Sequence, residues 1–345
     1  MYISRRQFIK YCSIAAGALG LNATDLMKIE KATAGPGGLP VLWIAGQACT
    51  GCTTSLANSV FYATIQDVLL FGVGPGGPTL DLKVCETLMA AMSNEATQQS
   101  PGITDSPFAL VIEGAITTTP GYCQIGSYTG AASENMSDVV KMLATHSNCA
   151  KILPVGTCAS FGGIPAATGN VTGAMGFLDF AKTLPQYQAL KKKTINIPGC
   201  PPNPNWVVGT IAYLLVNGPT TTPPIDSLRR PRTYYGQRIC NTCDRFATSL
   251  TGQDIGFVGV TSSNKMTVTE PNRIGDPTQN LPGGRCLKKA GCKGSKTKSD
   301  CSSLKWHSPN VGVAGVNWCV GAGAPCQGCT QNFFPDKMSP FHLIK

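Results

Sequence analysis

Between residues 40 and 218, short apolar runs alternate along the chain with glycine-rich loops and with stretches of helical periodicity. The apolar runs predict strands at 41–44, 108–112, 151–155 and 194–197, and the periodic stretches predict helices at 53–66, 136–145, 175–184 and 206–216. Continuous apolar strands that alternate with helices are typical of a doubly wound, parallel α/β sheet. Such sheets bind ligands at the carboxyl ends of their strands, so the chemistry is expected in the loops there.

From about residue 220 onward, neither the helical nor the strand pattern is sustained, and glycine, proline, serine and lysine are frequent. Eight of the 16 cysteines lie in this region: Cys240, Cys243, Cys286, Cys292, Cys301, Cys319, Cys326 and Cys329. A segment without a hydrophobic pattern needs another source of stability, and disulfides, zinc and iron–sulfur clusters are the candidates. The count suits two sites of four thiolates each.

Four further cysteines follow three of the predicted strands and lie beside glycines. The strand at 41–44 leads to Cys49 and Cys52, the strand at 151–155 to Cys158, and the strand at 194–197 to Cys200. Because these strand ends meet at one edge of the sheet, the pattern predicts a four-cysteine metal site there, rather than a set of buried thiols. The glycines let backbone N–H groups approach the sulfur atoms of a bound cluster. The remaining thiols, Cys85, Cys123 and Cys149, are interpreted as buried packing residues.

The first 34 residues have the pattern of an export signal. Ser4-Arg5-Arg6-Gln7-Phe8 contains a twin arginine, an apolar run follows at 11–21, and 32–34 offers a small-x-small cleavage site. The apolar run is shorter than the ~20 residues that span a bilayer, and a short amphipathic anchor helix is the weaker interpretation. The twin-arginine route carries folded proteins, which suits cofactor insertion before export and weighs against disulfides. Cys12 would leave with the signal.

The net charge of +10 raises the question of nucleic-acid binding. The basic residues are scattered, and no groove pattern of basic and aromatic residues appears, so we discount that class of partner. Without residues 1–34 the net charge is +7. Three four-thiolate iron–sulfur sites would each contribute about −2, so most of the surplus would compensate for anionic clusters.

The ordered set of motifs resembles the small, electron-transferring subunit of nickel–iron hydrogenases over almost the whole chain. The resemblance rests on Gln47-Ala48-Cys49-Thr50-Gly51-Cys52, Val111-Ile112-Glu113-Gly114, Gly156-Thr157-Cys158-Ala159, Pro198-Gly199-Cys200-Pro201-Pro202, Tyr235-Gly236-Gln237, Gly291-Cys292-Lys293-Gly294 and Met338-Ser339-Pro340-Phe341. It implies a flavodoxin-like domain at 35–220 with a proximal [4Fe–4S] cluster. An irregular domain at 221–345 would hold a medial and a distal [4Fe–4S] cluster.

Carried over by motif, the ligands form three sets of four. The proximal set is Cys49, Cys52, Cys158 and Cys200; the distal set is Cys240, Cys243, Cys286 and Cys292; the medial set is Cys301, Cys319, Cys326 and Cys329. The nickel–iron centre would belong to a separate large subunit, with no nickel in this chain. The implied function is that of a hydrogenase relay, which carries electrons between that centre and an acceptor such as a cytochrome or a membrane-anchored electron-transfer subunit.

Three departures from patterns found in the family matter here, at four positions. Cys240 stands where the first distal ligand is usually histidine, and Cys319 stands where most members have proline and hence a [3Fe–4S] medial cluster. A fourth medial thiolate resembles the nickel–iron–selenium branch. Gly51 and Gly163 stand where oxygen-tolerant members have two extra proximal cysteines, so that special cluster is not expected.

Other interpretations remain open at this point. A cluster-bearing subunit of respiratory NADH:quinone complexes has a similar proximal region, but it leaves the export signal and the eight later cysteines unexplained. A disulfide-stapled periplasmic binding protein and a structural zinc protein would both be colourless. Glu113 would help to move a proton or to contact a partner, or would be a surface carboxylate at a strand end. We expect a periplasmic protein without an apolar C-terminal span, attached to a membrane only through another subunit.

Overall fold

The computed structural model describes residues 39–59, 80–85, 87–88, 104–126, 133–246, 257–260, 266–268, 286–307 and 314–336. The predicted signal peptide and the end of the helix predicted at 53–66 lie outside these residues. Within the described ranges, no helix combines the length and the apolar character needed to cross a membrane.

Four parallel strands form the central sheet, β1 (Leu39–Ala45), β2 (Leu80–Cys85), β3 (Phe108–Glu113) and β7 (Cys149–Val155), in the spatial order β2-β1-β3-β7. All six residues of β3 are buried, as expected of a strand covered on both faces. Three of the strands were predicted. The edge strand β2 was not, because Asp81 and Lys83 interrupt its apolar residues.

The strand predicted at 194–197 exists only as extended chain along β7. Two parallel bridges join Ile152 to Thr194 and Val155 to Ile197. Ile195 N donates to Ile152 O and Ile197 N donates to Pro154 O, each at 2.9 Å, so the hydrogen bonds to β7 continue along this segment. The N–H of Asn196 points to the opposite edge, where it donates to Arg229 O at 2.9 Å.

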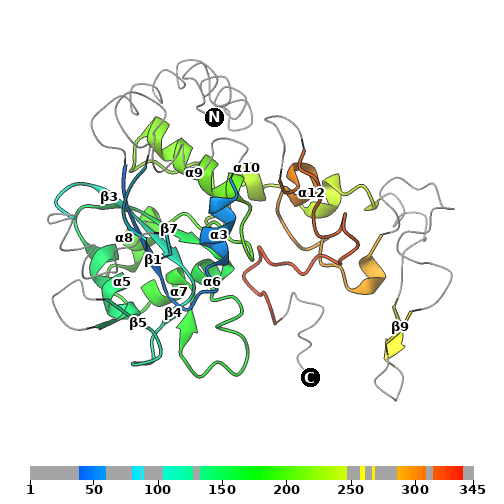
Figure 1. The fold of residues 1–345 in the computed structure, drawn as a ribbon, viewed down its shortest axis with the longest axis horizontal. Helices are drawn as coiled ribbons and strands as arrows, with labels where there is room; N and C mark the ends of the chain where they lie inside the picture. The colour runs from blue at the N-terminus through cyan, green and yellow to red at the C-terminus, as the bar shows by residue number, and fades with distance from the viewer. Residues whose placement is uncertain are drawn as a thin grey trace.

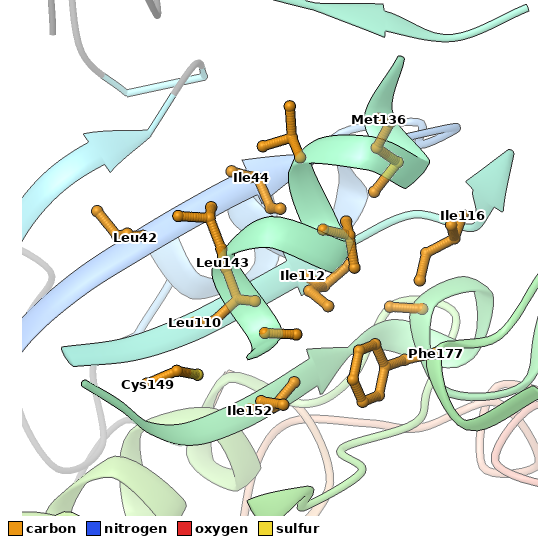
Figure 2. Close-up of a cluster of buried hydrophobic side chains, with 14 of the residues drawn as sticks. Leu42, Ile44, Leu110, Ile112, Ile116, Met136, Leu143, Cys149, Ile152 and Phe177 are labelled. Carbon is orange, nitrogen blue, oxygen red and sulfur yellow. The ribbon is translucent and has the colours of Figure 1, made fainter. Parts of the chain in front are cut away.

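Helices cover both faces of the sheet (Figure 1). On one face, α3 (Gly51–Ala57) and α9 (Pro204–Asn217) bury Leu56, Trp206 and Ile211 against β1, β3 and β7. On the other face lie α5 (Met136–Thr145), α7 (Phe177–Ala181) and α8 (Tyr187–Lys193). The packing of this second face is visible in Figure 2, where Leu143 of α5 lies over Leu110 of β3. The arrangement confirms an α/β fold with a parallel sheet.

The helix predicted at 175–184 is shorter in the structure, and its first residues belong to a strand. β8 (Ala174–Met175) pairs antiparallel with β4 (Ile116–Thr117), and α7 begins only after Gly176. The helix ends at Ala181, with Lys182 as its C-cap. A further antiparallel pair joins β5 (Gln124–Ile125) to β6 (Glu134–Asn135), and α6 (Gly156–Phe161) begins directly after β7.

The described elements from α10 onward each have three or four residues: α10 (Arg232–Tyr235), η2 (Ile239–Thr242), β9 (Phe257–Val260), β10 (Met266–Val268), η3 (Lys288–Ala290) and α12 (Cys301–Leu304). This region has a small core of its own, in which Ile239, Leu287, Trp318 and Val320 pack around Cys326.

Hydrogen bonds attach the region after residue 286 to the sheet-bearing part. Trp206 Nε1 donates to Asp300 Oδ1 at 2.7 Å, and Asn203 Nδ2 donates to Lys305 O at 2.8 Å. The buried guanidinium of Arg230 donates to Thr330 O at 2.8 Å. The later cysteines are thereby held against the part of the chain that carries the first four.

Candidate metal centres

The structure places the first four predicted cysteines at the carboxyl edge of the sheet. Cys49 follows β1 and Cys52 lies in the first turn of α3, while Cys158 lies in α6 directly after β7. Cys200 follows the extended chain beside β7. Because the strands are parallel, their carboxyl ends share one edge, and the four thiols come together there. Cys49 and Cys200 are exposed, and the other two are partly buried.

The pKa shifts of these four thiols reflect their closeness to one another. Burial raises the pKa of Cys52 far above its usual range, and negative charge on Glu113, Cys158, Cys49 and Cys200 raises it further. Burial also raises the pKa of Cys158 to about 12, with Cys200 the next contributor. Thiols that oppose one another's ionisation become thiolates readily only when a cation neutralises them, so the set suits a metal centre.

Two glycines leave room for sulfur at this edge. Gly156 has φ +88°, and a Cβ there would overlap Cys52 Sγ. Gly163 has φ +56°, and a Cβ there would lie 2.9 Å from Cys158 Sγ. Any side chain would therefore fill the space beside two of the four sulfur atoms. The residues present fit a sulfur-ligated group that needs close backbone approach.

Glu113 is buried, with 1% of its surface exposed, so the interpretation as a surface carboxylate is wrong. Its Oε1 accepts from Cys52 N at 3.0 Å and from Thr53 N at 3.3 Å, and its Oε2 accepts from Trp43 Nε1 at 3.1 Å and from Thr53 Oγ1. These donors lie on β1 and on the first turn of α3. Glu113 thus holds the turn that carries Cys52.

In the second set, Cys326 belongs to the small C-terminal core and Cys301 packs against it. Burial raises the pKa of Cys301 and of Cys329 well above the usual range, and it raises that of Cys326 to about 12. Cys329 and Cys326 add to the shift of Cys301, and Cys326 and Cys319 add to that of Cys329. Cys319 is exposed, but it is close enough to share in the electrostatics of this set. Ser299 Oγ also donates to Cys301 Sγ at 2.9 Å.

In the third set, Cys240 lies in η2 and Cys243 directly follows that helix. Burial raises the pKa of Cys240 to about 11, and the charges of Cys292, Cys243 and Cys286 contribute in that order, while Arg238 opposes them. A Cβ on Gly294 would lie 3.3 Å from Cys240 Sγ and 3.6 Å from Cys292 Sγ. All four thiols of this set are partly exposed. The structure therefore brings Cys240 into the set at the position where histidine is more usual.

The three sets are joined in series. A backbone hydrogen bond from Cys200 of the first set lowers the pKa of Cys329 of the second set, and the charge of Cys200 raises it by less, so the two cysteines are neighbours. Cys326 N of the second set donates to Cys292 Sγ of the third at 3.3 Å. The second set therefore lies between the other two.

Thr157 links the first set to the second, a role that the sequence did not predict. Its hydroxyl accepts from Gly199 N at 2.9 Å and donates to Cys329 O. Only its position beside Cys158 hinted at a function. Its partner Cys329 lies 172 residues away, so no local pattern reveals the contact.

No disulfide joins any two cysteines among the described residues, which weighs against a disulfide-stapled protein. In the same residues, no three Cys, His, Asp or Glu side chains are grouped closely enough to hold a single metal ion.

Cys85 and Cys149 are each 1% exposed. Each lies in one of the two hydrophobic clusters that cover the faces of the sheet, as predicted for packing cysteines, and Cys123 packs against one of those clusters. Cys12 lies outside the described residues.

Two family models match the chain. The family described as NADH ubiquinone oxidoreductase, 20 Kd subunit, matches residues 49–214, which include the first cysteine set. The family that describes the C-terminal part of the NiFe/NiFeSe hydrogenase small subunit matches residues 268–342, which include the second set. The second match is the one that a respiratory NADH:quinone subunit would not explain.

Curated relatives and solved structures agree with the second match. The chain is 33% identical to the periplasmic [NiFeSe] hydrogenase small subunit of Desulfomicrobium baculatum, with 100% of both chains covered. It is 30% identical to the periplasmic [NiFe] hydrogenase small subunit 1 of Nitratidesulfovibrio vulgaris, with 99% of this chain and 93% of the relative covered. The solved [NiFeSe]-hydrogenase of Dm. baculatum matches with a TM-score of 0.69 at 32% identity, over 89% of this chain and 99% of that chain.

Proposed function

The chain belongs to the family of nickel–iron hydrogenase small subunits, the electron-transfer partners of a catalytic large subunit, and from that premise we propose that twelve cysteines hold three [4Fe–4S] clusters. The proximal ligands are Cys49, Cys52, Cys158 and Cys200, the medial ligands are Cys301, Cys319, Cys326 and Cys329, and the distal ligands are Cys240, Cys243, Cys286 and Cys292. The observation that carries this proposal is the meeting of four thiols from three strand ends at one edge of the sheet, beside two glycines that leave room for sulfur.

A bound [4Fe–4S] cluster accepts and releases one electron at a time. This chain's own part is to hold the thiolates, to bring backbone close to sulfur at Gly156 and Gly163, and to keep the three sets in series. Hydroxyl groups such as that of Ser299 hydrogen-bond to ligand sulfur and thereby tune the reduction potential. An electron-transfer subunit of this kind needs no nickel of its own, since hydrogen is split in the large subunit.

We propose that the edge bearing the proximal set faces the large subunit. Cys49 and Cys200 are exposed there. Ile164 and Val171, in the loop after α6, expose 52% and 72% of their surface. Exposed apolar side chains beside a buried polar site are typical of a surface that a partner covers.

The strand order supports a flavodoxin-like domain at 35–220. Numbered in chain order, β2, β1, β3, β7 and the extended 194–197 follow the 2-1-3-4-5 order of that fold. Residues 221–345 then form the cluster-binding domain. The periplasmic relatives support export by the twin-arginine signal at 1–34, together with the large subunit. The acceptor is a redox protein, either a cytochrome or a membrane-anchored electron-transfer subunit.

Metal and sulfide analysis of the purified two-subunit protein tests the proposal. We expect about twelve iron and about twelve labile sulfide in the small subunit, in addition to the iron of the large subunit. The protein would be brown, with broad absorption in the visible range. Iron near eight in the small subunit, or abundant zinc, would show that one of the three sets has another purpose.

A further inference from the structure

Five basic residues lie within a few positions along the chain of distal-set cysteines. We call this group the basic face; its members are Arg238, Lys288, Lys293, Lys296 and Lys298. All are exposed except Lys293, which is partly buried. Arg238 lies close enough to Cys240 to lower the pKa of that thiol. The positive charge therefore lies where the third set reaches the surface.

The backbone of the basic face is fixed by hydrogen bonds. Arg238 and Lys298 form an antiparallel bridge, and Ile239 N donates to Thr297 O at 2.9 Å. Lys296 N donates to Lys293 O at 2.9 Å, which closes the turn that follows Cys292. The charges are thus held in a fixed arrangement on folded chain, as a specific contact requires.

Little negative charge opposes the basic face. Within the part of the chain that the structure describes, none of its five side chains forms an ion pair with a carboxylate. Asp244 is exposed beside Cys243, whereas Asp300 is directed inward to Trp206 Nε1. A four-thiolate cluster would add about −2, which leaves the surface around the distal set positive.

We infer that the basic face is the docking site of the electron acceptor, and that this acceptor is a redox protein with an acidic surface around its own centre. The inference rests on the proposed relay, because it takes the distal set as the point where electrons leave. Complementary charge steers two proteins into contact and orients them, and it raises the rate of association by 10- to 1,000-fold.

A protein partner fits this face better than an anionic membrane does. Binding to a bilayer interface by an amphipathic surface needs apolar side chains beside the basic ones. Phe246, whose N–H donates to Cys243 O, is the exposed large apolar side chain that a hydrogen bond places beside a described distal cysteine, and it exposes only 39% of its surface.

The test uses the two-subunit protein with all clusters in place. The probes are an acidic plant-type [2Fe–2S] ferredoxin, a basic mitochondrial-type cytochrome c, and vesicles of phosphatidylcholine with about 30% phosphatidylglycerol. Binding is measured by calorimetry at about 50 mM and about 200 mM NaCl, because screening weakens contacts between exposed charges. The test variant is Lys296→Glu with Lys298→Glu. The matched control is Lys141→Glu with Lys192→Glu, two exposed lysines on α5 and α8, which lie away from α12 in Figure 1.

We expect the ferredoxin to bind more tightly than the cytochrome c and to lose affinity with salt. The test variant should weaken ferredoxin binding by about tenfold, and the control by less than about twofold. Equal losses in the two variants, tighter binding of cytochrome c, or binding of the vesicles alone would overturn the inference. Hydrogen-dependent reduction of methyl viologen, which needs no docked protein, should be unchanged in both variants. Its absence from the unmodified protein would instead count against the proposed relay.

Discussion

At the scale of single residues, Cys319 decides the nature of the medial site. Its thiol is exposed, and its charge adds to the pKa shifts of Cys326 and Cys329, which supports our proposal that it is the fourth medial ligand. We expect Cys319→Pro to convert a [4Fe–4S] site to a [3Fe–4S] site. Iron in the small subunit should fall from about twelve to about eleven, and the oxidised protein should gain a [3Fe–4S] signal in electron paramagnetic resonance.

Cys149→Ala serves as the control for that substitution, because Cys149 is buried among apolar residues. It should leave both the iron content and the spectrum unchanged. A [3Fe–4S] signal already present in the unmodified protein, or none in Cys319→Pro, would contradict the assignment of Cys319 as a ligand.

Lys151 makes stability depend on pH. It lies on β7 with 1% of its surface exposed, and its Nζ donates to Thr220 O at 2.9 Å and to Thr222 Oγ1 at 3.0 Å. Burial lowers the pKa of Lys151 to about 8, and the charges of Arg229 and Lys193 lower it further. Since the unfolded chain keeps the ordinary pKa of about 10.4, it binds more protons than the folded chain in the window between the two values.

Stability should therefore rise with pH through that window, by at most about 1.4 kcal/mol per pH unit from this group. We expect the difference in Tm between the unmodified protein and Lys151→Met to move in favour of the unmodified protein as pH rises from about 8 to about 10. Thermal unfolding of both proteins at matched pH measures it, with Lys192→Met, an exposed lysine, as control. A difference that does not change with pH would show that Lys151 keeps its proton throughout.

At the scale of secondary-structure elements, Glu113 supplies from β3 the cap that α3 lacks. Thr50, at the start of α3, makes no capping bond with its own side chain. The carboxylate of Glu113 accepts from Cys52 N and Thr53 N instead. An anion at a helix N-terminus is also favoured by the helix dipole.

Glu113→Gln keeps the size of the side chain but turns one acceptor oxygen into a donor. We expect it to lower the free energy of unfolding by about 1–3 kcal/mol and to speed the loss of iron from the proximal site. Thermal unfolding and timed iron release to a chelator measure the two effects. Asp179→Asn, at an exposed carboxylate of α7, should change neither by a comparable amount. Unchanged iron release in Glu113→Gln would show that the cap does not hold Cys52.

The sequence predicted those elements whose cause is local. β1, β3 and β7 are continuous apolar runs because both faces are covered, and α5 and α9 have helical periodicity over ten and 14 residues. The extended chain at 194–197 keeps its hydrogen bonds to β7 through Ile195 N and Ile197 N, and on its outer edge Asn196 N pairs with Arg229 O. The pairing depends on chain about 30 residues away, which no local pattern contains.

The candidate sites also contain some residues that local sequence reveals and others that depend on distant parts of the chain. Cysteines are recognisable by residue type, and the place of four of them after strands of the sheet could be predicted from the sequence, whereas the assignment of the other eight to clusters stays a prediction. Glu113 and Thr157 are ordinary residues whose importance comes from contacts with distant chain, 61 and 172 residues away. Their roles became visible only when the fold brought those partners together.

At the scale of the whole molecule, Thr157 is the hydroxyl that joins the sheet to the cluster-bearing region. It is 1% exposed, it lies between Gly156 and Cys158, and it bonds both to Gly199 N and to Cys329 O. Cys158 and Cys200 of the first set and Cys329 of the second set thus lie beside, or one residue from, the partners of a single side chain. The distance and orientation between the proximal and medial sites should depend on it.

Thr157→Val keeps the shape of the side chain and removes the hydroxyl, whereas Thr157→Ser keeps the hydroxyl and removes a methyl group. We expect Thr157→Val to lower the free energy of unfolding by about 1–3 kcal/mol, since Gly199 N and Cys329 O lose a buried partner. It should also alter the magnetic interaction between the reduced proximal and medial clusters in electron paramagnetic resonance. Thr157→Ser should keep that interaction, even though the lost methyl group costs some stability. If both variants altered the spectrum equally, packing of the methyl group and not the hydroxyl bridge would set the relation between the two sites. If only stability changed, Thr157 would hold the two regions together without fixing the geometry of the relay.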